Sequence, residues 1–378
     1  MRAHSLRGRN CSGEAGSRQV RVGRVLIGGG APVSLQSMTK TDTREVEATL
    51  AEIRELEQAA CDLVRVAIPD EEAARAFARI KRQARAPLIA DIHFDHRLAL
   101  MALDAGADKL RLNPGNIRKA EHVKAVVTAA RDHGVPIRVG ANLGSLPPDV
   151  RARHRDALTT PEGAARALFE AAMAHVRILE ELDFRDTVVS LKAFDVPATI
   201  EAYRLAARET DYPLHLGITE AGPPPAGVIR SAVGIGVLLA EGIGDTIRVS
   251  LTAPAVEEVR VGREILRALE LRCGGVTLVS CPTCSRSAMD VQQAALQVEQ
   301  ELRALDRTLQ REARELRVAV MGCAVNGPGE ARDADVGIAA DARGVVLFSK
   351  GEVVRRLEPD EAITALIAEA QRLASESS

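Results

Sequence analysis

The chain has 378 residues, of which 46% are hydrophobic and 27% are charged, and its formal net charge is −2. This is the composition of a globular protein, and the near-neutral charge disfavours a general DNA-binding protein. With no Trp, two Tyr and six Phe, the chain lacks the rings of a single-strand nucleic-acid platform, and no apolar run approaches the roughly 20 residues of a membrane span. We therefore expect neither nucleic acid nor a membrane as a partner.

The N-terminal residues 1–17 are polar and aperiodic, and we expect them to form a disordered tail. They contain no apolar segment typical of a secretory signal, which favours a cytoplasmic location and a reducing compartment. The next segment, 19–27, alternates apolar and polar residues up to Gly28-Gly29-Gly30 and predicts a short hairpin. Because no Gly-Lys-Ser/Thr follows the glycines, they predict a turn and not a phosphate loop.

From Pro32 onward, short apolar strands alternate with helical stretches of about 12–18 residues. Helices are clearest at 44–60, 161–182 and 255–270. The eight predicted strands are 33–37, 62–67, 87–91, 109–112, 135–140, 187–191, 214–218 and 245–250. Eight β/α units in this length predict a (β/α)8 TIM barrel for residues 18–272. A doubly wound open sheet is the alternative, but the Gly-rich dinucleotide fingerprint that it predicts after the first strand is absent.

A smaller α+β domain is predicted for residues 273–378, where the rhythm changes. Its predicted strands are 276–280, 317–321, 335–339, 344–348 and 352–356, with helices at 287–313 and 359–374.

Basic side chains gather at the carboxyl ends of the predicted barrel strands, where barrel enzymes place their catalytic groups. The four that come from middle strands are Arg65, Arg111, Arg138 and Lys192, and the eighth predicted strand ends with Arg248 and Ser250. Unpaired cations at one mouth repel each other, so the pattern predicts a highly charged anionic ligand such as a diphosphate. The structural alternative is that each Arg pairs with a helix carboxylate at the rim.

Acid and base candidates at the same end are Asp91, His93 and Glu220. No second His or Cys stands at ligand spacing from His93, so we expect it to hold substrate and not metal. Lys192 is also compatible with a Schiff-base lysine, as in barrel aldolases.

Three cysteines of the second domain predict a metal site. Cys281 and Cys284 follow one strand, and Cys323 follows another. Three thiolates are one short of a closed zinc or iron–sulfur set, and Cys273 or Glu330 are both candidates for the fourth ligand. A structural zinc site with Glu330 as an ordinary helix-start acid is the alternative. We expect Cys11 and Cys61 to be plain thiols.

Several segments together resemble the 4-hydroxy-3-methylbut-2-enyl diphosphate synthase family of bacterial two-domain type. The barrel carries IGGGAPVSLQSMTKTDT (27–43), ADIHFD (90–95), LRLNPGNI (110–117), IRVGANLGSL (137–146), SLKAFD (190–195), LGITEAG (216–222) and DTIRVSLT (245–252). The second domain carries SCPTCSR (280–286) and GCAVNGPGEARDADVGIA (322–339). Ser285 departs from the glycine usual in the family.

The resemblance implies a TIM barrel followed by an iron–sulfur domain of the kind found in sulfite and nitrite reductases. It implies a [4Fe–4S] cluster on Cys281, Cys284 and Cys323 with Glu330 as the fourth ligand. The implied reaction is the reductive opening of 2-C-methyl-D-erythritol 2,4-cyclodiphosphate by a homodimer, with flavodoxin or ferredoxin as electron donor. The implied substrate contacts are Arg65, Arg111, Arg138, Asn142, Lys192 and Ser250, with Asp91, His93 and Glu220 nearer the reacting carbons.

Two other classes of protein remain as alternatives. One is a lysine-dependent barrel aldolase with a zinc-bound C-terminal domain. The other is a non-catalytic iron–sulfur sensor, which does not bind a cyclic diphosphate stoichiometrically.

Overall fold

The computed structural model describes residues 16–117, 119–323, 333–341 and 343–376. The chain divides into two compact units, Met1–Arg272 and Cys273–Ser378. The predicted disordered tail lies almost wholly outside the described residues.

The first unit is a barrel of eight parallel strands, which confirms the predicted fold class. The strands are β3 (Ser34–Met38), β4 (Leu63–Ala67), β5 (Leu88–Asp91), β6 (Lys109–Arg111), β7 (Ile137–Asn142), β8 (Thr187–Lys192), β9 (His215–Leu216) and β10 (Thr246–Ile247). They follow in the order β8-β7-β6-β5-β4-β3-β10-β9. A single parallel bridge joins Val189 on β8 to Leu214, the residue directly before β9, and completes the ring.

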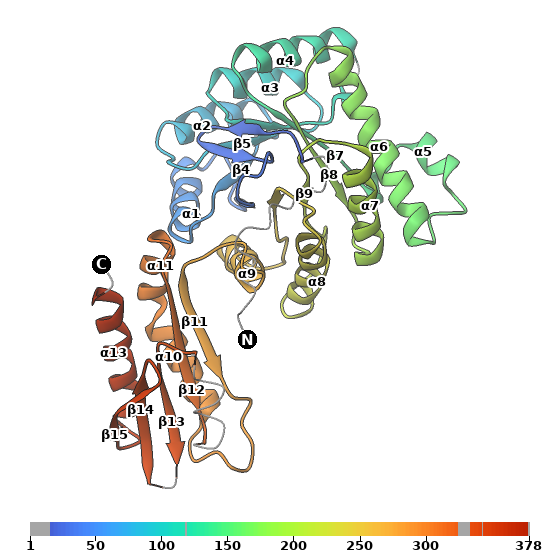
Figure 1. Cartoon of the computed structure of the whole chain (residues 1–378). Helices are drawn as coiled ribbons and strands as arrows, with labels where there is room; N and C mark the ends of the chain where they lie inside the picture. Colours follow the sequence, from blue (N-terminus) through green and yellow to red (C-terminus); the bar gives the residue numbers. More distant parts are fainter. Residues whose placement is uncertain (1–15, 118, 324–332, 342, 377–378) are drawn as a thin grey trace. The chain divides into compact units, whose positions relative to one another are not determined.

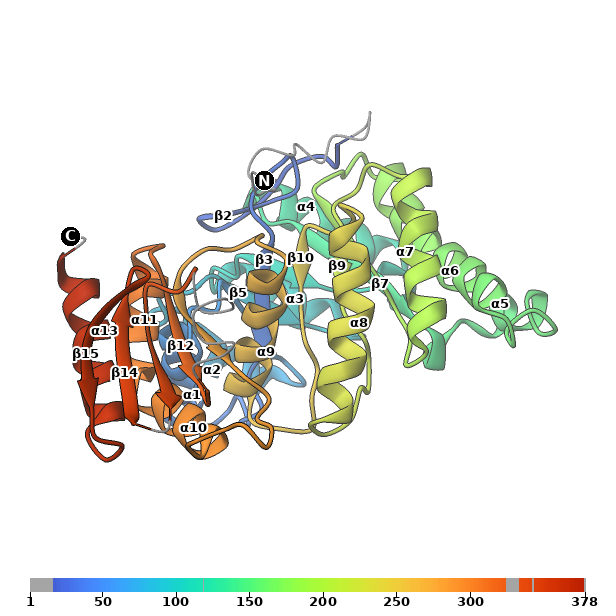
Figure 2. The ribbon, with the colours of Figure 1, turned by 60° about the horizontal axis from the view of Figure 1, so that its bottom comes forward.

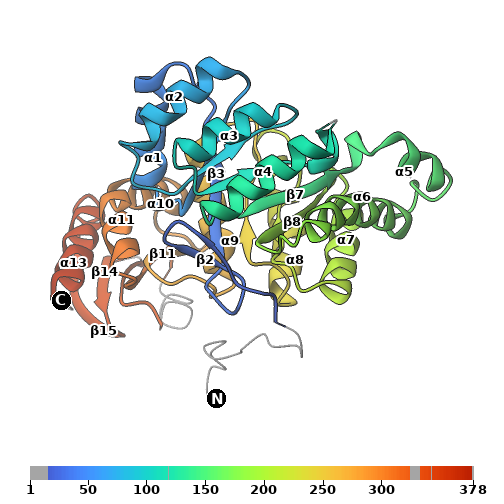
Figure 3. The ribbon, with the colours of Figure 1, turned by 90° about the horizontal axis from the view of Figure 1, so that it is seen from above.

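Helices surround the strands, as Figures 1 and 3 show. They are α1 (Val46–Gln58), α2 (Glu71–Lys81), α3 (His96–Asp104), α4 (Ala120–Asp132), α5 (Pro148–Arg153), α6 (Pro161–Glu181), α7 (Val196–Glu209), α8 (Ala226–Ala240) and α9 (Ala255–Ala268). Short 3-10 turns occupy Pro114–Asn116 and Leu143–Ser145. Leu, Val, Ile and Ala from the helices and the outward strand positions form one continuous core, as the composition predicts.

Side-chain caps fix where several of these helices begin. Asp70 accepts a hydrogen bond from the Ala73 amide at the start of α2, and Asp195 accepts one from Ala198 at the start of α7, both at 2.8 Å. Asp95 caps α3 through the Arg97 amide. Such caps satisfy amides that have no partner within the helix. Asp95 and Asp195 close the sequences ADIHFD and SLKAFD, so these two motif acids act as helix caps.

A hairpin closes the amino-terminal end of the barrel. Its strands are β1 (Val20–Val22) and β2 (Val25–Ile27), and the turn lies at Gly23-Arg24, five residues before the Gly28 turn. Gly23 has φ +54°, a conformation that favours glycine. Val22 and Ile27 pack against Leu63 and Ile89, which lie in the amino-terminal halves of β4 and β5. The opposite, carboxyl-terminal end of the barrel is left for the site.

The second unit is a five-stranded sheet with helices on one face (Figures 1 and 2). Its strands are β11 (Gly275–Ser280), β12 (Glu315–Met321), β13 (Val336–Asp341), β14 (Gly344–Ser349) and β15 (Glu352–Leu357), in that order across the sheet. The first three run parallel and the last two antiparallel. The helices are α10 (Val291–Glu301), α11 (Arg303–Arg311) and α13 (Ala362–Glu376).

One predicted element of this unit differs from the structure. The sequence predicts a single helix over 287–313, but the helix breaks at Leu302 into α10 and α11. Leu302 is buried, as are Val298 and Leu309. The break lets both short helices turn apolar residues toward the same sheet face, which one straight polar helix would not do.

Candidate active site

The predicted binding residues lie at the carboxyl ends of neighbouring barrel strands. Asp91 on β5 is in register with Arg111 on β6, and Arg111 is in register with Arg138 on β7. At the end of the same strand, Asn142 is opposite Lys192 on β8. The parallel register therefore brings residues that are up to 101 positions apart in the sequence to one end of the barrel.

Asp91 is shared by two guanidinium groups. Its carboxylate lies 3.7 Å from Arg65 Nε and 3.6 Å from Arg111 Nε, and the side chain is buried. Arg65 also donates from Nε and Nη2 to the sulfur of Met38 at 3.0 and 2.8 Å. Burial raises the pKa of Asp91, but the charges of Arg65 and Arg111 outweigh burial and the pKa is lowered overall. One ionised carboxylate facing two cations leaves a local excess of positive charge.

Arg138 and Lys192 are buried without a carboxylate partner in the described part of the chain. Arg138 donates from Nη1 to the Ser190 hydroxyl at 2.7 Å, whereas its Nε and Nη2 have no hydrogen-bond partner there. Glycine at position 217 leaves space for Lys192, because a Cβ atom there would lie 2.8 Å from Lys192 Nζ. These donors are arranged as if for an acceptor that the protein itself does not supply.

The pKa shifts report the same crowding of positive charge. Burial, reinforced by neighbouring cations, lowers the pKa of Arg138 and of Lys192 well below their ordinary values. Burial also lowers the pKa of Arg65 to about 10, although Asp91 opposes this effect. Such a cluster destabilises the ligand-free protein and is typical of a site that binds an anion.

Arg248 belongs to this cluster, although the predicted set of substrate contacts left it out. It follows β10, and its positive charge contributes to lowering the pKa values of Arg65 and Lys192. Its Nη2 lies 3.4 Å from Glu258 on α9. The structural alternative was that each arginine pairs with a helix carboxylate. It applies to Arg248, which pairs with Glu258 on α9, whereas Arg65 and Arg111 share Asp91 on a strand.

A further cation, Lys109, lies deeper in the barrel. It precedes Arg111 by two positions on β6, is fully buried, and its Nζ has no hydrogen-bond partner among the described residues. His215 on β9 is likewise fully buried with both ring nitrogens unpartnered. Burial, with the charges of Arg138 and Arg65, lowers the pKa of Lys109 well below its ordinary value of 10.5.

Replacing Lys109 by Met should stabilise the ligand-free protein by about 1–4 kcal/mol at pH 7, since an apolar side chain of similar length removes an uncompensated buried charge. Because the folded-state pKa lies below the unfolded-state value, the unfolded chain binds more protons between these two values. Stability of the natural protein should therefore rise with pH toward 10.5, and the variant should lack this slope. Urea unfolding at pH 7 and 9 measures both effects. The exposed Lys119→Met variant is the control, and marked destabilisation of Lys109→Met would contradict the prediction.

The predicted acid and base residues occupy the loops at the same end. His93 follows β5 and is largely exposed; partial desolvation of its ring lowers its pKa, with Arg111 and Arg65 adding to this and Asp91 opposing it. The ring is therefore neutral near pH 7. Glu220 follows β9, is exposed, and has φ +55°. A non-glycine residue in this conformation is strained, and such strain is frequent at functional sites. Ser250 is half-buried in the segment after β10.

The cysteine segments of the second unit are joined to each other by hydrogen bonds. Cys281 and Cys323 follow the adjacent parallel strands β11 and β12, and the Gly322 amide donates to Cys281 Sγ at 3.2 Å. The Ala288 amide donates to the Gly322 carbonyl at 2.8 Å. A side chain at Gly322 would collide with Ser287, since its Cβ would lie 2.2 Å from Ser287 Oγ.

The loop between Cys281 and Cys284 holds Thr283 at φ +61°, which a β-branched residue rarely adopts. Cys284 is exposed and Cys281 partly so. Thiols near an exposed loop, with an amide donating to sulfur, are the donor set that an iron–sulfur cluster uses. By contrast, burial raises the pKa of Cys61 to about 12, which keeps this thiol protonated.

Two predicted roles lie outside the described residues, those of Glu330 and Cys11. Among the residues that are described, no group of three or more His, Cys, Asp or Glu side chains comes together as a metal site. In the same residues, no helix combines the length and the hydropathy that crossing a bilayer requires.

Comparison with known proteins decides the family. The sequence model of the GcpE TIM-barrel domain matches residues 17–263, and that of the GcpE C-terminal domain matches residues 277–372. The chain belongs to the GcpE family. It is 54% identical over 354 residues to the 4-hydroxy-3-methylbut-2-en-1-yl diphosphate synthase (flavodoxin) of Dehalococcoides mccartyi, covering 93% of this chain and 97% of the relative.

A second relative of this GcpE protein agrees with that assignment. The enzyme of the same name from Geobacter sulfurreducens is 53% identical over 363 residues, which covers 96% of this chain and 99% of the relative. A solved dihydropteroate synthase from Coxiella burnetii is 11% identical and covers 68% of this chain and 98% of its own, with a TM-score of 0.47. The family that the sequence motifs predict is thus confirmed.

Proposed function

We propose that the chain converts 2-C-methyl-D-erythritol 2,4-cyclodiphosphate into (E)-4-hydroxy-3-methylbut-2-enyl diphosphate in isoprenoid biosynthesis. Two electrons and two protons enter, and the C2–O bond to the ring phosphate breaks with that oxygen staying on phosphorus. The C3 oxygen leaves as water, and a double bond forms between C2 and C3. The product keeps both phosphates as a linear diphosphate. Two relatives at 53–54% identity carry the name of this enzyme, which supports the proposal.

The observation that carries the proposal is the cationic mouth of the barrel. Arg138 and Lys192 are buried without a carboxylate partner among the described residues, and Arg65 and Arg111 share one. A cyclic diphosphate supplies the negative charges and the several acceptor oxygens that such donors require. Bidentate contacts from the arginines fix its orientation, and Lys192 adds a point charge.

The remaining predicted contacts divide between binding and proton transfer. Asn142 and Ser250 offer neutral hydrogen-bonding groups at the ends of β7 and β10. Asp91 is ionised and orients Arg65 and Arg111, and neutral His93 provides a hydrogen bond to the substrate. Glu220 is the group that we assign to protonating the departing C3 oxygen.

For the cofactor, we propose a [4Fe–4S] cluster held by Cys281, Cys284 and Cys323, with Glu330 as the fourth ligand. The donor chemistry of the described cysteine segments and the amide that donates to Cys281 Sγ support it. When bound, the cluster supplies low-potential electrons and a Lewis-acidic iron for cleaving an unactivated C–O bond. We propose flavodoxin or ferredoxin as the electron donor, a homodimer as the working unit and the cytoplasm as its location.

Anaerobic purification followed by iron and sulfide analysis, with an absorption spectrum, tests this function. We expect a brown protein that converts the cyclic diphosphate when reduced flavodoxin is supplied, with the linear product identified by mass spectrometry. A colourless protein that takes up no iron in anaerobic reconstitution contradicts the proposal. Borohydride trapping of a substrate adduct at Lys192 would support the aldolase alternative instead.

Glu330→Ala is expected to retain iron while losing most turnover, because the three thiolates remain but the exchangeable fourth ligand is gone. Iron content and turnover are measured on the same anaerobic preparation. Glu315→Ala provides a control, since Glu315 is an exposed acid at the start of β12. Unchanged turnover of Glu330→Ala would refute its assigned role.

A further inference from the structure

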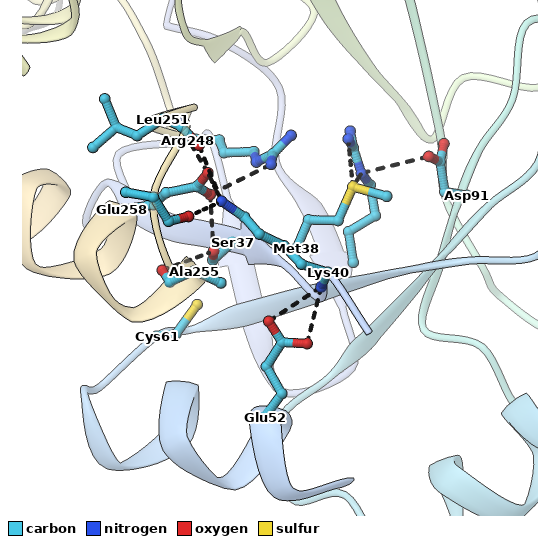
Figure 4. A network of polar contacts seen from close by, with 12 residues as sticks. Ser37, Met38, Lys40, Glu52, Cys61, Asp91, Arg248, Leu251, Ala255 and Glu258 are labelled. Carbon is cyan, nitrogen blue, oxygen red and sulfur yellow. Dashed lines mark hydrogen bonds and ion pairs between the residues drawn. The ribbon is translucent and has the colours of Figure 1, made fainter. Parts of the chain in front are cut away.

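Helix α9 places one buried carboxylate, Glu258, beside the mouth of the barrel (Figure 4). The residue is 2% exposed. Its carboxylate accepts hydrogen bonds from the Leu251 amide at 3.0 Å and from the Ser37 hydroxyl at 3.3 Å. It also pairs with Lys40 Nζ at 3.1 Å and with Arg248 Nη2 at 3.4 Å. A buried charge of this kind is tolerated because four donors surround it.

The same contacts join two loops at the catalytic end. Lys40, which follows β3, also donates to the Leu251 carbonyl at 3.0 Å and to the Ala253 carbonyl. Leu251 comes directly after Ser250, one of the predicted substrate contacts. Glu258 and Lys40 therefore hold both the amide and the carbonyl of the residue next to Ser250.

Arg248 is the link between this network and the cation cluster. Glu258 engages its Nη2, whereas its Nε is buried without a hydrogen-bond partner in the described part of the chain. The charge of Arg248 also reaches Arg65 and Lys192, since it contributes to lowering the pKa values of both. The protein thus fixes the Nη2 side of the Arg248 guanidinium, while its Nε remains available to donate a hydrogen bond.

We propose that Glu258 is a positioning residue for diphosphate recognition, which acts by orienting Arg248 toward the anion. This inference rests on the proposed function, because it assigns the anion to the cyclic diphosphate. Glu258 touches no substrate atom in this assignment. Its effect on binding passes through Arg248.

A double-mutant cycle tests whether Glu258 acts through Arg248. Affinity for 2-C-methyl-D-erythritol 2,4-cyclodiphosphate is measured by calorimetry on the full-length, cluster-containing protein. Glu258→Gln keeps the shape of the side chain and an acceptor for the Leu251 amide but removes the charge. We expect each of Glu258→Gln and Arg248→Met to weaken binding by about tenfold or more, the range of hydrogen bonds to charged groups.

The double variant is expected to bind about as weakly as Arg248→Met alone, since Glu258 has nothing left to orient. Losses that multiply would overturn the proposal. Turnover at saturating substrate should fall much less than affinity in Glu258→Gln, whereas a general structural defect lowers both. If Glu258→Gln does not fold, Glu258→Asp keeps the charge, withdraws it from Arg248 by one methylene, and enters the same cycle.

Glu52 provides the matched control. It is a carboxylate on α1 that accepts from the Lys40 and Thr41 amides (Figure 4), so it holds the loop after β3 without contacting Arg248. Any loss of affinity in Glu52→Gln should multiply with that of Arg248→Met. If the natural protein binds no cyclic diphosphate, the proposed function fails; if it binds but the Glu258 cycle is additive, only the positioning role fails.

Discussion

Cys281→Ser should leave a folded protein that takes up little iron. The three cysteines bind the proposed cluster as thiolates, and a serine hydroxyl does not ionise near neutral pH, so the loss of Cys281 leaves two of the three predicted thiolates. Iron and sulfide per chain after anaerobic reconstitution, together with the visible absorption of the cluster, measure the effect. We expect both to fall close to background and turnover to be lost.

Cys273→Ser is the matched control for this experiment. Cys273 is exposed and begins the same unit, but it lies outside the proposed ligand set. It should retain full iron content, and a loss there would revive Cys273 as the fourth ligand in place of Glu330. Far-ultraviolet circular dichroism checks that each variant keeps its secondary structure. A Cys281→Ser protein that carries full iron would contradict the proposed ligand set.

The barrel was predictable because short apolar strands and amphipathic helices alternate eight times. Strand alternation also tells which side chains share a face: Arg111 and Lys109 are two positions apart on β6, and both are directed toward the cation cluster. The signal for Lys109 was therefore present in the sequence. Because a lysine is seldom fully buried, its position in a strand does not by itself predict a buried cation.

The pairing of Glu258 with Arg248 was harder to predict. The two residues lie ten positions apart in different elements, and only the packing of α9 against β3 brings the carboxylate beneath the loop after β10. Periodicity indicates which face of α9 is buried, but it does not tell which donors a buried acid meets. The break at Leu302 depends in the same way on the sheet beneath the helices.

The proposed cluster ligands also divide into those that the sequence pattern predicts and one that it does not. Spacing and strand ends predict that Cys281 and Cys323 each follow a strand, and the structure shows that these strands, β11 and β12, are adjacent. The proposed fourth ligand lies in a Gly- and Pro-rich stretch of sequence, for which neither helix nor strand periodicity gives a rule. Glu330 was therefore assigned through family resemblance, and it stays a prediction.

Arg138→Met should change stability and affinity in opposite directions. In the ligand-free protein the guanidinium is buried, two of its nitrogens are unpartnered among the described residues, and nearby cations repel it. An apolar side chain removes this cost, so the free energy of unfolding should rise. The two donors that serve the diphosphate are lost at the same time, and affinity should fall by about 100-fold or more, as two charge-assisted hydrogen bonds predict.

Urea unfolding without ligand and calorimetric titration with the cyclic diphosphate measure these two effects on one preparation. Arg204→Met is the control, because Arg204 lies on α7 and pairs with Glu201 and Glu241 away from the cation cluster. It should leave affinity unchanged and should not stabilise the protein. The signs of the two effects distinguish the two roles. Removing an arginine with a structural role lowers stability, whereas removing an arginine that is held in place for an anion lowers affinity without lowering stability. Loss of stability with unchanged affinity in Arg138→Met would show that this arginine is satisfied within the protein and does not serve a diphosphate.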